Sequence, residues 1–265
     1  SNDINIFLND ETIIGEKYLL YATVEDHIGN TLSFSIKFTG YNSHVPKIIM
    51  TEIKTISDTS QNKFEKENNY FRNEFVEFLA LTDGNLSGLE IVSANDGEEK
   101  KYTFPPINVK KGEIFVVHLR NRGDGCVSEL ENNLNLSSTT YTSLEIRDLW
   151  SDNTETVFGN KTDIILLKNS ANNEILDGIM YKDKELEDWA KKYETFLIML
   201  ENANIYESTD CANSIISEGV TGTKNLHRKD ADLIYEKILN NEEINYPLKQ
   251  KSDSWYVSSA TAGLL

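Results

Sequence analysis

The stretch NEFVEFLALTDGNLSGLEIVSA, residues 73–94, contains two short apolar segments separated by a turn at Asp83-Gly84-Asn85. Both segments carry β-branched or aromatic residues and are too short for a typical helix, which favours β-strands. The Asp-Gly pair between them supplies the backbone freedom that a tight turn needs. The stretch therefore predicts two consecutive strands joined by a turn.

Comparable apolar segments occur on both sides of this pair: PKIIMTEI (46–53), KYTF (101–104), GEIFVVHLR (112–120), DIILLKN (163–169) and EILDGIMY (174–181). A second turn signal lies at Asn95-Asp96-Gly97, and Ser170-Ala171-Asn172-Asn173 joins the last two segments. Short strands at this spacing, bounded by turn residues, are typical of two packed antiparallel sheets. The sequence therefore predicts a mostly β protein with an antiparallel sandwich.

After Tyr181 the period of the apolar residues changes from two to about 3.6, the period of a helix. The apolar residues that share one face of the first predicted helix are Leu186, Trp189, Ala190, Tyr193, Phe196, Leu197 and Leu200. A second helix is expected to begin near Ser208 or Thr209 and to end before Gly219, because Ser and Thr are good N-caps and Gly commonly follows a helix. A third passes through Ala231, Ile234, Tyr235 and Ile238.

The last residues, SDSWYVSSATAGLL (252–265), are strand-like again. We therefore expect one β domain over residues 46–265 with a helical insertion at about 183–241, and not a separate helical domain at the C-terminus. If a ligand binds, we expect it where the helices meet the sandwich.

Residues 1–45 predict a β-hairpin. TLSFSIKF (31–38) alternates strictly between apolar and polar residues, KYLLYATVE (17–25) alternates less regularly, and Gly29-Asn30 forms a good turn pair between them. A hairpin alone is marginally stable in water, so this segment must dock on something larger.

The ordered set of motifs resembles a lamin-tail domain. The residues that carry the resemblance are Thr51-Glu52, Glu74-Phe75-Val76-Glu77, Ser87-Gly88-Leu89-Glu90-Ile91, Gly112-Glu113-Ile114-Phe115-Val116-Val117, ILDGIMY (175–181) and Thr261-Ala262-Gly263. The chain departs from the family pattern at Thr51 for Asn, Leu89 for Trp and Ala262 for Pro, all packing or turn positions. The resemblance covers about residues 46–120 and 163–181 and the last dozen residues.

This resemblance implies an antiparallel immunoglobulin-like β-sandwich. Bacterial members usually belong to exported or cell-surface proteins, where they are accessory modules. Residues 22–38 likewise resemble the final hairpin of a bacterial immunoglobulin-like repeat. The hairpin could be the end of a preceding domain or a pair of strands added to the main domain.

The charge disfavours two classes of partner. Of 265 residues, 43 are acidic and 26 basic, which gives a formal net charge of −17. Such a field repels nucleic acid and anionic membranes and therefore disfavours the binding of nucleic acid. No apolar run is long enough to span a bilayer. Membrane attachment is therefore expected only through an anchor upstream of this chain, and the partner is expected to be a protein or a glycan.

Catalytic motifs such as GxSxG, HExxH and phosphate-binding glycine loops are absent from the sequence. The four histidines, His27, His44, His118 and His227, lie far apart in the sequence, and His118 in an apolar strand reads as a packed structural residue. Glu52, Glu74 and Glu77 could pair as general acid and base, but their positions also suit outward or strand-end side chains. We therefore expect no enzyme, no catalytic residues and no cofactor.

Two loops, 82–88 and 94–99, hold enough Asp, Asn and Gly to consider calcium. Neither fits the twelve-residue calcium loop, and plain β-turns need the same residues. The tripeptide Arg122-Gly123-Asp124 is one that host adhesion receptors read, and it could act as an exposed adhesive loop. It is also an ordinary loop sequence.

Cys126 and Cys211 are the two cysteines. They are either unrelated free thiols or a disulfide, which an exported protein would permit. The expected function is a non-catalytic binding or structural module of an exported bacterial protein, periplasmic or on the cell surface, and part of a lipoprotein if an upstream anchor exists. The alternative is an accessory module that positions a hydrolase domain on extracellular nucleic acid or glycan.

Overall fold

The computed structural model describes residues 5–8, 12–57, 67 and 73–264. Its strands are β1 (Lys17–Glu25), β2 (Thr31–Thr39), β3 (Ile48–Lys54), β4 (Phe75–Ala80), β5 (Gly84–Asn85), β6 (Leu89–Ser93), β7 (Gly97–Thr103), β8 (Asn108–Val109), β9 (Ile114–His118), β10 (Arg147–Trp150), β11 (Asp163–Asn169), β12 (Ile175–Lys182), β13 (Ile215–Ile216), β14 (Lys224–Arg228) and β15 (Trp255–Ser259). The helices are α2 (Glu194–Asn202) and α3 (Ala231–Leu239), with single 3₁₀ turns at Lys191–Tyr193 and Cys211–Asn213.

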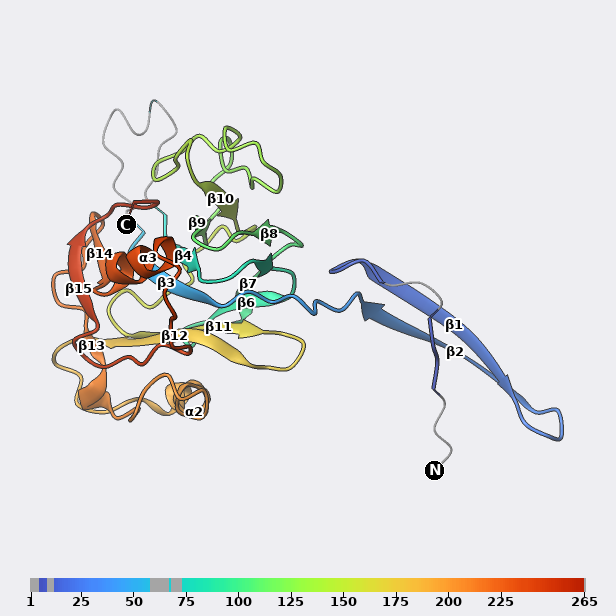
Figure 1. Cartoon of the computed structure of the whole chain (residues 1–265). Coiled ribbons are helices and arrows are strands. Elements are labelled where there is room, and N and C mark those ends of the chain that lie inside the picture. The colour runs from blue at the N-terminus through green and yellow to red at the C-terminus, as the bar shows by residue number, and fades with distance from the viewer. Residues whose placement is uncertain (1–4, 9–11, 58–66, 68–72, 265) are drawn as a thin grey trace.

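Two sheets pack face to face into a sandwich (Figure 1). One sheet has the strand order β10-β9-β4-β3-β14-β15, and the other has the order β13-β12-β11-β6-β7. Alternation along the strands explains the core. On β4, for example, Val76, Phe78 and Ala80 point into the sandwich, whereas the intervening residues point outward. The predicted mostly β sandwich with a helical insertion is confirmed.

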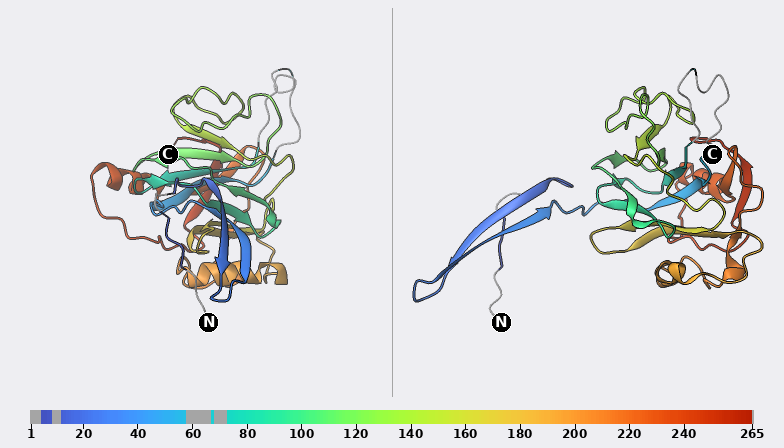
Figure 2. Two further views of the ribbon diagram at one scale, coloured as in Figure 1. Left: turned by 90° about the vertical axis from the view of Figure 1, so that its right-hand side faces the viewer. Right: turned by 180° about the vertical axis from the view of Figure 1, so that it is seen from behind.

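Each sheet also has an apolar outer face that a helix covers. Leu200 of α2 packs on Ile164, Leu166 and Met180 of the five-stranded sheet. On the six-stranded sheet, the residues that pack against Ile234 and Ile238 of α3 are Ile49, Leu79 and Leu81. Figures 1 and 2 show α2 and α3 on different outer sides of the sandwich. This double coverage explains why β3, β4 and β11 are buried along their whole length.

The sheets are mixed, which corrects the expectation of wholly antiparallel pairing. β10 runs parallel to β9, and β13 runs parallel to β12, each as an edge strand. A parallel neighbour requires a long crossover connection. The long segments between β9 and β10 and between β12 and β13 supply it. No local pattern in these segments distinguishes parallel from antiparallel pairing, so the sequence did not reveal it.

The predicted helical block also differs from the structure in three places. Leu186, Trp189 and Ala190, expected on the first helix, precede it, because the 3₁₀ turn begins at Lys191 and α2 begins at Glu194. The second helix expected after Ser208 is only the 3₁₀ turn Cys211–Asn213, and β13 follows it directly. β14 then lies inside the block and pairs with β3 and β15. Five residues are too few for their apolar period to distinguish a strand from a helix, so the sequence could not reveal β14.

The N-terminal hairpin forms a sheet of its own. β1 and β2 pair with each other through the whole length of both strands, and Figure 1 shows them extending away from the sandwich. Among the described residues, no helix is long and apolar enough to cross a membrane.

Candidate functional site

Glu52 and Glu77 lie opposite each other on β3 and β4, on the outer face of the six-stranded sheet. Each side chain is about 1% exposed. The register of the two strands shifts between Met50 and Glu52, so Thr51 is an extra, bulged residue. Its hydroxyl donates a hydrogen bond to Oε1 of Glu77 at 2.6 Å. The bulge thereby supplies a donor to a buried carboxylate.

These two carboxylates hold the C-terminal segment. Oε1 of Glu52 accepts hydrogen bonds from Nδ2 of Asn225 (2.6 Å) and from the backbone N–H of Thr261 (3.1 Å), and Oε2 accepts the Thr261 hydroxyl (2.8 Å). Oε2 of Glu77 accepts the backbone N–H of Gly263. We refer to Glu52, Glu77, Thr261 and Gly263 as the C-terminal clasp.

Gly263 is required by its geometry. Its φ is +86°, and a Cβ atom there would lie 2.2 Å from Cδ1 of Ile146. Only glycine adopts this backbone conformation readily and leaves room for Ile146. The Thr-Ala-Gly ending therefore fits the clasp through both its donors and its shape.

Burial dominates the electrostatics of the clasp. It raises the pKa of Glu77 to about 7, although the Thr51 hydrogen bond opposes this rise. The negative charge of Glu52 raises the pKa further, and the Gly263 N–H lowers it. The Glu77 carboxyl therefore titrates near neutral pH, and it is the same carboxyl that accepts the hydrogen bond from the Gly263 N–H.

His227 of β14 is the register partner of Glu52 on its other side. Its Nε2 lies 3.6 Å from Oε1 of Glu52, beyond hydrogen-bond distance, and its ring packs on Tyr256 at 5.4 Å between centroids. A cavity of about 160 Å³ borders this group, lined in part by Thr51, Glu77 and His227. It is small, and the carboxylate oxygens beside it are already engaged by the tail.

Glu74 lies apart from this pair. Residues three apart in an extended chain point to opposite faces, so Glu74 and Glu77 diverge. The Glu74 carboxylate accepts the N–H groups of Val157 (2.8 Å) and Phe158 (3.2 Å), and burial raises its pKa to about 7. The structure thus brings together two of the three acidic residues considered from the sequence, and not all three.

A buried polar network inside the sandwich was not recognised from the sequence. Asp177 of β12 pairs with Arg228 of β14 at 3.0 Å, and both side chains are at most 2% exposed. Asp177 also accepts the Met50 N–H at 2.7 Å and Nε2 of Gln250 at 2.9 Å. Nε1 of Trp255 donates to Gln250 at 2.7 Å. A charged residue in the apolar run ILDGIMY was the one available signal for this link between the two sheets.

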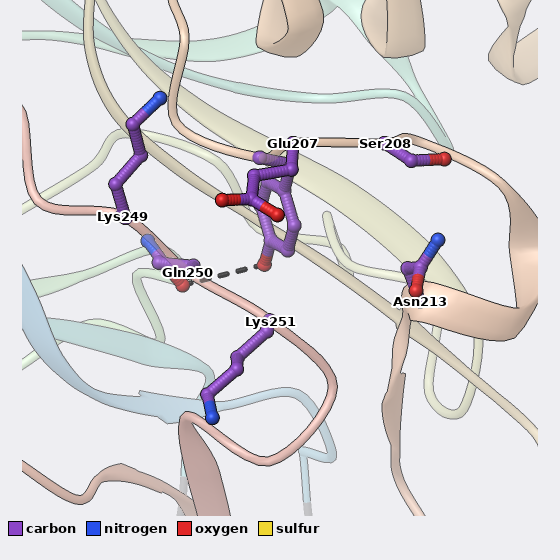
Figure 3. A pocket seen from close by; sticks show the side chains of 7 residues that line it. Glu207, Ser208, Asn213, Lys249, Gln250 and Lys251 are labelled. Atoms are coloured by element: carbon purple, nitrogen blue, oxygen red, sulfur yellow. Dashed lines mark hydrogen bonds between the residues drawn. The ribbon is translucent and has the colours of Figure 1, made fainter.

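A pocket of about 260 Å³ lies beside this network, at the junction where we expected a ligand. It is lined by Tyr206, Glu207, Ser208, Asn213, Lys249, Gln250 and Lys251. The Tyr206 hydroxyl donates to Oε1 of Gln250 at 3.3 Å, and Figure 3 shows Lys249 and Lys251 extending in different directions. The polar groups therefore do not converge on one point.

The loops considered for calcium are turns held by protein groups. Asp83 accepts the Lys111 N–H and pairs with Lys110, and Asp96 pairs with Lys100. Within the part of the chain that the structure describes, no group of three or more His, Cys, Asp or Glu side chains could hold a metal ion. In the Arg122-Gly123-Asp124 loop, Arg122 is half-buried, whereas Gly123 and Asp124 are exposed.

Cys126 and Cys211, considered as a disulfide pair, are both free and buried in the structure. Cys126 packs beside Trp150 of β10, whereas Sγ of Cys211 donates to the Leu186 carbonyl at 3.6 Å. The two thiols therefore have separate surroundings, Cys126 beside an edge strand of the six-stranded sheet and Cys211 beside the loop that follows β12. His118 is fully buried, bonds Asp148 at 2.6 Å and stacks on Trp150, as its apolar strand predicted.

Comparisons with known proteins define the family. Residues 46–257 match the family model TP_1001_2nd, described as a protein second domain. An "Uncharacterized protein" of Treponema pallidum (strain Nichols) is 27% identical over 169 residues, which are 63% of this chain and 40% of that relative. The chain thus spans about 40% of the length of this relative. The family match covers the sandwich from just before β3 into β15, so the chain belongs to the TP_1001_2nd family.

Proposed function

We propose that this protein is a non-catalytic binding or structural module of an exported bacterial protein. The observation that carries the proposal is the C-terminal clasp. Glu52 and Glu77 are the two acidic residues considered from the sequence that lie together, and their oxygens accept hydrogen bonds from the chain's own tail and from Thr51 and Asn225. A general acid or base must instead reach a proton on the substrate.

The shape of the site supports the same proposal. The cavity beside the clasp is about 160 Å³, below the range of most small-molecule sites. Glu52 and Glu77 are each about 1% exposed, so the tail and the neighbouring strands shield both carboxylates from solvent. The raised pKa of Glu77 follows from this burial and needs no catalytic explanation.

The assignment to the lamin-tail type rests on the resemblance and gains support from the clasp. Glu52, Glu77 and Thr261-Ala262-Gly263 are motif positions of that resemblance, and they contact one another across more than 180 residues of sequence. Motif residues that contact one another in this way support the proposal that the chain has the same architecture as lamin-tail domains. The resemblance supports an exported or surface location. Cys126 and Cys211 are free thiols, so they give this location no support of the kind that a disulfide would have given.

The proposal is tested by assaying the purified chain on phosphate esters, nucleic acids and glycans, with and without divalent metal. We expect no turnover. Metal-dependent hydrolysis that is lost in Glu52→Gln and Glu77→Gln but kept in Glu74→Gln would overturn the proposal. Glu74→Gln is the matched control because Glu74 is an equally buried carboxylate outside the clasp.

The location requires a separate experiment on the full-length protein in its own bacterium. We expect external protease or a membrane-impermeant label to reach it in intact cells or in cells with a permeabilised outer layer. Protection that persists until the cytoplasmic membrane is broken would contradict the proposed export.

A further inference from the structure

The N-terminal hairpin has a continuous apolar face. Tyr18 pairs with Phe38, Leu20 with Ile36, Ala22 with Phe34, and Val24 with Leu32, so all eight side chains lie on one side of the ribbon. None of the eight is buried, and Leu32 and Ile36 are 63% and 47% exposed. A face of this kind is what one layer of a β-sandwich presents to the other.

The hairpin does not complete either sheet of the sandwich. Within the described residues, β1 and β2 pair only with each other, and Figures 1 and 2 show them projecting from one end of the molecule. If this segment were strands added to the main domain, β1 or β2 would pair with a strand of the sandwich, and neither pairs with any that the structure describes. A two-stranded ribbon alone is also too small to be stable in water.

The base of the hairpin is fixed to the sandwich. Nδ2 of Asn42 donates to the backbone carbonyls of Asn85 (2.7 Å) and Ser87 (3.0 Å), and the His44 carbonyl accepts the Asn85 N–H at 2.7 Å. Asn42 is 9% exposed. The base of the hairpin is thus held at a defined place beside the sandwich, which leaves its apolar face open to a second folded unit.

We infer that the β1–β2 ribbon is the last hairpin of a preceding β-domain, and that its apolar face is covered by strands of the same polypeptide upstream of residue 1. Two observations select this occupant. The family match begins at residue 46, after the hairpin, and that family is described as a second domain. The Treponema pallidum relative is also much longer than the matched region, which covers 40% of it.

Cysteine labelling of the full-length protein tests this inference, with the 265-residue chain as reference. Ile36→Cys probes the apolar face, and Leu19→Cys is the matched control on the opposite face, because the native residues are 47% and 45% exposed. In the 265-residue chain we expect both variants to react with a maleimide at similar rates. In the full-length protein we expect Ile36→Cys to react at least about tenfold more slowly, with Leu19→Cys unchanged.

Several results would overturn the inference. These are equal labelling of the two variants in the full-length protein, a full-length protein with no strand-forming sequence ahead of the hairpin, or protection of Ile36→Cys already in the 265-residue chain. In the last case, light scattering at dimer mass would identify a second copy as the occupant, and monomer mass would mean that the hairpin folds back on its own sandwich. Hydrogen exchange of the unsubstituted β1 and β2 amides, expected to be slower in the full-length protein, gives the same answer without a variant.

Discussion

Glu77 accepts a hydrogen bond from the backbone N–H of Gly263, so a carboxylate at the centre of the six-stranded sheet holds a residue 186 positions later in the chain. Thr261 makes the equivalent contact with Glu52 on the neighbouring strand. The residues that follow β15 are thereby fixed against the outer face of the sheet.

Removing the Glu77 carboxylate is expected to destabilise the protein. Glu77→Ala leaves the Thr51 hydroxyl and the Gly263 N–H without their acceptor, which costs about 2 kcal/mol of unfolding free energy. Chemical denaturation followed by tryptophan fluorescence measures this change. Glu236→Ala, at an exposed position of α3, is the control and is expected to change stability little. Equal effects of the two substitutions would contradict a role for Glu77 in the clasp.

The stability of the protein is expected to fall as pH rises from about 5 to 8. Burial raises the pKa of Glu77 from 4.5 to about 7, so the folded state holds a proton that the unfolded state releases. The stabilising contribution is full below pH 4.5 and is lost as pH rises through 7, a change of about 1–3 kcal/mol. Glu74 and Asp163, with pKa values raised to about 7 and 6, change in the same direction.

Glu77→Gln isolates the contribution of Glu77 to the pH dependence of stability, because Gln does not titrate. Denaturation midpoints at several pH values between 5 and 8 are expected to depend less on pH in this variant than in the unsubstituted protein. An unchanged pH dependence would show that Glu77 has an ordinary pKa in the folded state.

Gly263→Ala is expected to loosen the tail. The substitution strains a backbone at φ +86° and forces a Cβ against Ile146. Gly97→Ala is the matched control, since Gly97 also has positive φ but nothing within 4 Å of its Cβ position. Gly263→Ala should lower the melting temperature more than Gly97→Ala does. The expected difference in the free energy of unfolding is about 1 kcal/mol or more. Equal losses would mean that the contact with Ile146 is unimportant.

Breaking the ion pair inside the sandwich should have the largest effect. Asp177→Ala removes the buried carboxylate that pairs with Arg228 and leaves the guanidinium with the half-exposed Asp230, at 3.1 Å, as its charged partner, at a cost of about 3–5 kcal/mol. Denaturant unfolding of Asp177→Ala against the double variant Asp177→Ala/Arg228→Met measures it, because the second change removes the positive charge that has lost its buried partner. A double variant no more stable than Asp177→Ala would contradict this explanation.

Local patterns in the sequence predicted the layers well. Strict alternation in residues 31–38 and the apolar segments around Val76 and Phe115 identified strands. The helical period near Leu200 identified the face that packs on the five-stranded sheet. Period and turn chemistry are local properties, and these features depend on them alone.

The clasp and the internal ion pair depend on contacts that local patterns do not contain. Glu52 meets Thr261 across 209 residues, and Asp177 meets Arg228 across 51. The parallel pairing of β10 was equally hidden, because it depends on the path of the preceding loop. Sequence reasoning could identify Glu52 and Glu77 as notable, but not that the tail occupies them.

Hydrogen exchange of the segment from Thr261 to Gly263 tests the central claim most directly. If Glu52 and Glu77 hold the tail, its amides will exchange slowly in the unsubstituted chain and quickly in Glu77→Ala, while β4 and β9 stay protected in both. Rapid exchange of the tail in the unsubstituted chain would show that the clasp is open and the two carboxylates accessible, which would contradict the structural role proposed for them.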